Sequence, residues 1–161
     1  MTADPFGERL ADYVNHHSAY LWLLDFDTLE PAEQALIGTW ELEQEIYNGG
    51  FWQYLCNESG ARARKLNEIL RDIGAADTAA LVAQALNILG SGVDYEDEKA
   101  RWSTVQAMSP EQRHKLSELD KIFDCQVPAL NRALFQFLSV HRETLDVPDT
   151  FWSEVDADDP R

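Results

Sequence analysis

The chain of 161 residues contains few cysteines, few cations and no long apolar run. Its two cysteines, Cys56 and Cys125, are far apart and form no C-x-x-C motif, so we expect two buried thiols in a reducing compartment. No stretch approaches the roughly 20 apolar residues of a membrane span. Residues 1–10 lack the basic and apolar parts of a signal peptide. The expected location is therefore the cytoplasm.

Positive charge is also scarce, because 13 Lys and Arg residues face 29 Asp and Glu residues, for a net charge of −16. Residues 1–60 hold eleven acids and one base, whereas residues 101–145 are close to neutral. Such a surface repels nucleic acids and acidic membranes, and it attracts basic protein surfaces. We therefore expect no direct contact with nucleic acid or membrane. Solubility alone is the other explanation for the charge.

Strand signals are nearly absent, since no apolar–polar alternation and no hairpin turn between β-branched runs is present. Helical periodicity is found instead along most of the chain. The predicted helices span residues 8–24, 31–48, 51–57, 62–73, 77–89, 109–123 and 128–141, and residues 93–108 are predicted to form a loop with at most a helical turn. The predicted fold is an all-α, single-domain bundle of six or seven helices with an acidic surface. The bundle is assigned to residues 1–147 and an acidic C-terminal tail to residues 148–161.

The most unusual stretch is E-I-Y-N-G-G-F-W-Q-Y-L-C-N, residues 45–57. It predicts a helix that ends at Asn48, a turn on two glycines, and a second short helix. Gly49 or Gly50 can adopt the positive φ that ends a helix. Gln53 and Asn57 are candidates to satisfy the backbone groups left unpaired at the break. These residue types predict a structural motif rather than an active site.

No catalytic or metal-binding pattern is present in the sequence. The adjacent His16 and His17 point about 100° apart on a helix, and no H-E-x-x-H or E-x-x-H motif occurs. Cys56 lacks the positive surroundings that make a thiol reactive. The acids at 25–27 and 94–98 could bind a cation, but they lack EF-hand spacing. We therefore predict no enzyme, no metal and no cofactor.

One acid is locally inconsistent with its predicted helix. Glu43 falls inside the apolar arc of residues 31–48, where an unpaired carboxylate is costly. It predicts a paired or hydrogen-bonded group, or the edge of a groove. A groove that binds a peptide or small ligand is therefore an alternative function, and its predicted residues are Trp40, Glu43, Phe51, Trp52 and Gln53.

The acidic surface itself predicts the leading function. Carboxylates one helical turn apart are separated by about 6 Å along the axis, which is similar to the spacing of phosphates along a nucleic-acid strand. The Lys/Arg groove of a DNA-binding protein would then meet a surface like that of DNA. The predicted function is to occupy that groove in competition with DNA. The acids predicted to form this surface are Asp25, Asp27, Glu30, Glu33, Glu41, Glu45, Asp94, Glu96, Asp97 and Glu98.

The stretch at residues 45–57 resembles the signature E-V-x-N-G-G-F-x-Q-(F/Y)-F-x-N of an all-helical bacterial family of DNA-mimic proteins. The residues at pattern positions are Glu45, Asn48, Gly49, Gly50, Phe51, Gln53, Tyr54 and Asn57, and Leu55 departs where the family prefers an aromatic. The resemblance covers residues 30–90. It implies a helical fold, an acidic surface and dimerisation. It also implies a basic DNA-binding protein, such as a transcription factor or nucleoid protein, as the partner.

Overall fold

The structure is a computed structural model that describes residues 4–153, and within them the regular elements are all helical. The α-helices are α1 (Pro5–His17), α2 (Pro31–Cys56), α3 (Ala63–Asp72), α4 (Ala76–Leu89), α5 (Glu98–Gln106), α6 (Pro110–Val140) and α7 (Thr150–Ser153). Short 3-10 helices connect some of them: η1 (Ala19–Leu23), η2 (Phe26–Thr28), η3 (Glu58–Arg62) and η4 (Arg142–Thr144). The predicted all-α bundle is confirmed.

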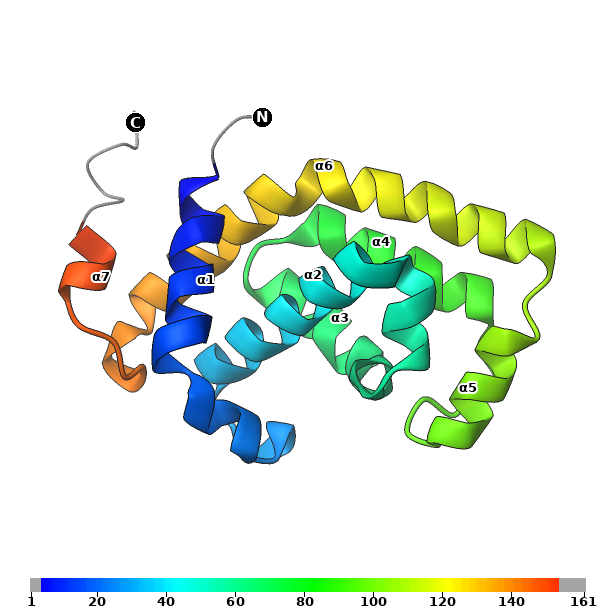
Figure 1. Ribbon diagram of the computed structural model, residues 1–161, viewed down its shortest axis with the longest axis horizontal. Coiled ribbons are helices and arrows are strands. Elements are labelled where there is room, and N and C mark those ends of the chain that lie inside the picture. Colours follow the sequence, from blue (N-terminus) through cyan, green and yellow to red (C-terminus); the bar gives the residue numbers. More distant parts are fainter. Residues whose placement is uncertain (1–3, 154–161) are drawn as a thin grey trace.

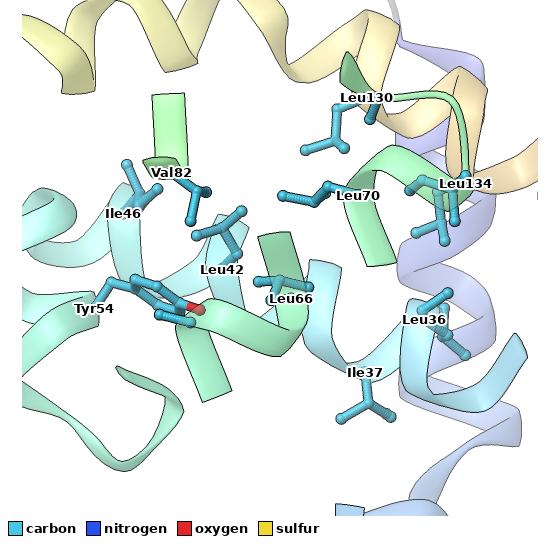
Figure 2. Close-up of a cluster of buried hydrophobic side chains, with 14 of the residues drawn as sticks. Leu36, Ile37, Leu42, Ile46, Tyr54, Leu66, Leu70, Val82, Leu130 and Leu134 are labelled. Atoms are coloured by element: carbon cyan, nitrogen blue, oxygen red, sulfur yellow. The ribbon is translucent and has the colours of Figure 1, made fainter. Parts of the chain in front are cut away.

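The long helix α6 runs along one side of the bundle, from α5 at one end to α1 and α7 at the other (Figure 1). Helices α2, α3 and α4 pack beneath it. Leu42, Leu70 and Val82 point toward one another from these three helices (Figure 2). Burial of such a side chain stabilises the fold by about 1.5–3 kcal/mol. In the described part of the chain, no helix is long and apolar enough to cross a membrane.

Helix α2 begins as predicted, with Pro31 at its first position and a capping box between Glu30 and Glu33. Its buried face differs in detail from the expected arc. Tyr47, in the last turn before the break, is 83% exposed, whereas Gly38 is buried beside Leu66 and Phe26.

The first predicted helix, residues 8–24, is shorter in the structure. The Asp4 carboxylate caps α1 by accepting a hydrogen bond from the Gly7 N–H, so the helix starts at Pro5. It ends at His17, where the Ser18 hydroxyl donates to the carbonyl of Val14. Such side-chain bonds to the backbone compete with helix continuation. The following apolar residues form the 3-10 helix η1 and remain largely exposed.

The loop predicted at residues 93–108 contains the helix α5. Asp97 caps it by accepting a hydrogen bond from the Ala100 N–H. Its inward positions are Arg101 and Val105, one turn apart, and both are buried. Sequence periodicity missed this helix because a buried arginine reads as a polar, outward-facing residue.

The helix predicted to start at Pro128 is a continuation of α6, which passes through this proline. A proline inside a helix removes one backbone hydrogen bond and costs about 3 kcal/mol. Phe123 and Leu130, on either side of it, are both buried in the same core. Packing of both halves on one core offsets the loss, so the chain does not turn here. The predicted start at Ser109 is confirmed by its capping box with Gln112.

Glycines follow the ends of α3 and α4. Gly74 and Gly90 have φ values of 85° and 104°, just after these helices end. The helix predicted to start at residue 77 starts one residue earlier, because Ala76 is its first residue and Asp77 lies in its first turn. There its carboxylate still interacts favourably with the helix dipole.

Part of the region assigned to an acidic tail packs on the bundle. Phe151 and Trp152, in α7, are 5% and 2% exposed. Their rings contact Phe135 of α6, and Phe151 also meets Tyr13 of α1. These aromatic contacts make Phe151 and Trp152 part of the core. The remaining residues of the predicted tail lie outside the described part of the chain.

Candidate functional site

The glycine pair marks a sharp break inside α2. Gly49 has an extended φ of −163°, and Gly50 has φ 73° and ψ −176°, a region that favours glycine. The helix that resumes at Phe51 has its first N–H bound to the Asp120 carboxylate of α6, at 2.8 Å. Burial raises the pKa of Asp120, while the Phe51 N–H opposes that rise. The break is therefore a contact point between α2 and α6.

The amides of the motif bind an acid of the same motif. Gln53 Nε2 and Asn57 Nδ2 donate to the same oxygen of Glu45, at 2.7 and 2.8 Å. This corrects the expectation that Gln53 and Asn57 satisfy the backbone at the break, since Asp120 does that. These two hydrogen bonds, which we call the Glu45 clamp, tie the two halves of α2 together across the kink. It also engages Glu45, which was predicted to lie on the partner-binding surface.

Among residues 4–153, the most deeply buried charged residue is Arg101, which sequence reasoning missed. It is 1% exposed, and its guanidinium donates to the backbone carbonyls of Leu55, Asn57 and Tyr95. The first two carbonyls belong to the C-terminal end of α2, and the third lies in the segment before α5. One side chain therefore fastens the end of the motif to the acidic segment at residues 94–98.

The acidic segment 94–98 has a fixed shape. Its four carboxylates are exposed, whereas Tyr95 between them is buried. Asp94 accepts hydrogen bonds from the N–H groups of Glu96 and Asp97, and Asp97 caps α5. Among the described residues, no ion pair involves these four acids. The segment therefore presents concentrated negative charge on a constrained backbone.

The acids predicted at residues 25–41 are more engaged with their own chain. Asp27 pairs with Lys65 at 2.6 Å, and Glu41 pairs with Arg62. Burial raises the pKa of Glu41, and the Arg62 hydrogen bond opposes that rise. The guanidinium of Arg62 also lies 4.8 Å from the centroid of the Phe26 ring. Two cations thus interrupt the predicted row of carboxylates on this side.

The three other acids of that group lie at the start of α2 and before it. The Asp25 carboxylate accepts from the Asp27 N–H, and Glu33 accepts from the Glu30 N–H. Asp25 and Glu30 remain exposed, whereas Glu33 is partly buried. Their hydrogen bonds fix local turns and leave the charge available at the surface.

The two predicted acidic groups do not lie directly side by side. Arg62 and Lys65 bind acids of the group at residues 25–41. Arg64 stacks on Tyr95 of the segment 94–98, 4.7 Å from its ring centroid. A short basic segment at the start of α3 therefore lies between them. The structure leaves 94–98 as the predicted acidic group least engaged by internal partners.

Three of the five residues predicted to line the alternative groove are engaged inside the fold. Phe51 is fully buried and meets the ring of Phe123 edge-on. Glu43 hydrogen-bonds to Asn131 of α6 and lies near Asp4, whereas Gln53 is bound to Glu45. These three side chains are therefore held by different internal partners.

The hydrogen-bonded state predicted for Glu43 is confirmed, and it has a pH consequence. Burial and the nearby Asp4 carboxylate raise the pKa of Glu43 from 4.5 to about 7. The folded state then retains a proton that the unfolded state releases, so stability falls as pH rises from about 4.5 to about 7. We expect Glu43→Gln to be more stable than the parent by up to about 3 kcal/mol at pH 8.

At pH 4 the two proteins are expected to unfold at nearly the same urea concentration, because Glu43 is then protonated in both states. Urea unfolding at both pH values measures this difference. Glu68→Gln, on the exposed face of α3, is the matched control. A gain for Glu43→Gln that is equal at pH 4 and pH 8 would contradict the assignment.

The cysteines do not form a reactive centre. Burial raises the pKa of the Cys56 thiol, which disfavours the reactive thiolate. The expectation of two buried thiols is wrong for Cys125, which is exposed on α6. Among residues 4–153, no three His, Cys, Asp or Glu side chains converge as metal ligands would.

The comparisons with known proteins identify one family. A family described as DMP19-like protein matches residues 27–141, well over half of the chain. No curated protein and no solved structure matches the chain. The matched region includes the break in α2, its Asp120 contact, the Glu45 clamp and Arg101. The chain belongs to the DMP19-like family.

Proposed function

We propose that the chain is a non-enzymatic, DNA-mimic-like protein. It binds the nucleic-acid-binding surface of a basic protein, such as a transcription regulator, and competes there with DNA. Membership of the DMP19-like family, a family of DNA mimics, supports this role. The two free cysteines suit a reducing compartment, and a cytoplasmic location is part of the proposal.

The acidic segment 94–98 is the observation that carries the proposal. A mimic of DNA must present negative charges at fixed positions, because a flexible acidic tail would lose conformational entropy on binding. Here Arg101 and the buried Tyr95 hold the backbone, and four carboxylates point outward from it. Asp25 and Glu30 add charge on the same chain. We assign the main partner contact to Asp94, Glu96, Asp97 and Glu98.

Capture and displacement test the proposal. The immobilised protein is incubated with cell lysate at low salt, and bound proteins are released with either duplex DNA or a neutral dextran. We expect the duplex DNA to release DNA-binding proteins from the immobilised protein. The neutral dextran should leave them bound. Their apparent affinity should fall steeply with salt, as for proteins that contact several phosphates. Bound proteins that DNA does not release would contradict the proposal.

A further inference from the structure

A patch of consecutive apolar side chains is exposed at η1. Tyr20, Trp22, Leu23 and Leu24 are 39%, 42%, 86% and 52% exposed, while Leu21 between them is buried. We call these four exposed residues the Trp22 patch. A contiguous exposed apolar surface of this kind often marks a protein-binding site. The Trp22 patch does not pack into the core. It contains a tryptophan, a residue type enriched among binding hot spots.

A hollow of about 440 Å³ lies beside the patch. Trp22 and Leu24 line it together with Glu41, Glu58 and Arg62. Asp25 also lines it, so three carboxylates face a single guanidinium there. That guanidinium is already paired with Glu41. The hollow therefore combines an apolar edge with an excess of negative charge.

Acids outside the hollow also lie close to the patch. The Tyr20 hydroxyl lies 3.5 Å from the Glu33 carboxylate. Burial raises the pKa of Tyr20, and the nearby Glu33 and Asp146 carboxylates raise it further. Carboxylates thus lie both in the hollow beside the Trp22 patch and next to its Tyr20 hydroxyl. A ligand that covered the patch with its own acids would meet like charge.

The charge pattern selects one kind of occupant. A second copy of this chain, with a net charge of −16, would bring like charges to an acidic border. A basic segment would place its cations on the bordering acids and its apolar side chain on Trp22. We propose that the Trp22 patch and its hollow bind a segment of a basic protein that carries a large apolar side chain flanked by Lys or Arg.

This inference rests on the proposed function, because the segment would belong to the same basic partner. It adds a source of specificity that carboxylates alone do not provide. Charge complementarity mainly accelerates association and responds to salt, whereas a buried apolar anchor slows dissociation and persists at high salt. The partner would therefore be distinguished from other DNA-binding proteins by the apolar side chain beside its basic surface.

Fluorine NMR on protein containing 5-fluorotryptophan tests the inference. The probes are two 14-residue helical peptides with the same lysines, one with leucines at i, i+3, i+4 spacing and one with serines in their place. The Trp22 resonance is assigned from Trp22→Phe. We expect the leucine peptide to shift this resonance saturably in 0.5 M NaCl, and the serine peptide to bind at least tenfold more weakly.

The matched variants are Leu23→Ser with Leu24→Ser in the patch, and Ile122→Ser with Val140→Ser on α6. All four side chains are exposed aliphatics, at 46–86%, so both variants should fold. The patch variant is expected to weaken binding of the leucine peptide at least tenfold, and the α6 variant to leave it unchanged. Equal binding of the two peptides, or equal loss in the two variants, would overturn the inference.

Sedimentation of the free protein tests the competing occupant. If the parent forms a dimer that the patch variant turns into a monomer, a second copy covers the Trp22 patch and the inference is wrong. No DNA is present in these experiments. Failure of DNA displacement would therefore count against the proposed function alone, and failure of peptide binding against this inference alone.

Discussion

Replacing Gly50 with alanine is expected to lower the free energy of unfolding by about 3–5 kcal/mol. The backbone at Gly50 has φ 73° and ψ −176°. For a residue with a Cβ, backbone strain in such a region costs about 1–3 kcal/mol. The new Cβ would also overlap the Asp120 carboxylate. Displacement of that carboxylate would leave the Phe51 N–H without its charged acceptor, at a further cost of about 1.5–3 kcal/mol.

Urea unfolding followed by far-UV circular dichroism measures this loss. Gly74→Ala is the matched control, because Gly74 also has a positive φ, of 85°, but a Cβ there meets nothing within 4 Å. We expect it to cost only about 1 kcal/mol. Asp120→Asn, which retains an oxygen acceptor, should lose less than Asp120→Ala. Equal losses for the two glycine variants would show that the Asp120 contact does not stabilise the break.

Replacing Arg101 with methionine is expected to cost about 4 kcal/mol. The substitution fills a similar volume, but it leaves the carbonyls of Leu55, Asn57 and Tyr95 without the donor that they share. Each unsatisfied buried group costs about 1–3 kcal/mol, less any contact with water that it regains. The end of α2 and the acidic segment would then separate. Amide hydrogen exchange at residues 94–98 should therefore accelerate.

Arg64→Met is the control for this prediction. Arg64 contacts the same segment, through the ring of Tyr95 and the carbonyl of Val93, but it is exposed. Exposed contacts of this kind are worth less than about 1 kcal/mol. If Arg101→Met does not fold, Arg101→Lys keeps the charge with fewer donors and should show an intermediate loss. Unchanged exchange at 94–98 in a destabilised Arg101 variant would contradict the role assigned to Arg101.

The helical fold could be predicted because most helix ends are specified locally. The capping boxes at Glu30 and Ser109 and the glycines after α3 and α4 all act within a few residues. The break in α2 is equally local, since only glycine easily adopts the backbone conformation found at Gly50. Such signals are present in the sequence whatever the tertiary contacts are.

The elements that were missed depend on tertiary contacts. Arg101 is buried only because three carbonyls converge on it, and no local pattern shows that convergence. Pro128 continues a helix because residues on both sides of it pack on one core. Phe151 and Trp152 follow an acidic, loop-like stretch, and their burial depends on Phe135 and Tyr13. In each case packing outweighed the local preference.

The acidic surface could be predicted as a composition but not as a site. The sequence does not distinguish a carboxylate that faces solvent from one that holds the fold together. Glu41 and Glu45 were chosen for their spacing on one helix, and the structure shows them bound to Arg62 and to two motif amides. The segment 94–98 drew attention by charge alone, and the reason for its fixed shape is a residue outside it.

Displacement of DNA by the acidic segment tests the central claim most directly. A DNA-binding protein captured from lysate is bound to a fluorescent duplex, and displacement is followed by anisotropy. Two triple variants are compared with the parent. One neutralises the segment with Asp94→Asn, Glu96→Gln and Glu98→Gln and keeps the Asp97 cap. The other neutralises exposed acids elsewhere, with Glu8→Gln, Glu68→Gln and Asp72→Asn.

Both triple variants lose three negative charges from the same total of −16, so they differ only in where the charge is removed. We expect the parent and the control variant to displace the duplex at similar concentrations. The segment variant should require at least tenfold more protein. Equal displacement by the two variants would contradict the claim that residues 94–98 take the place of DNA on the partner.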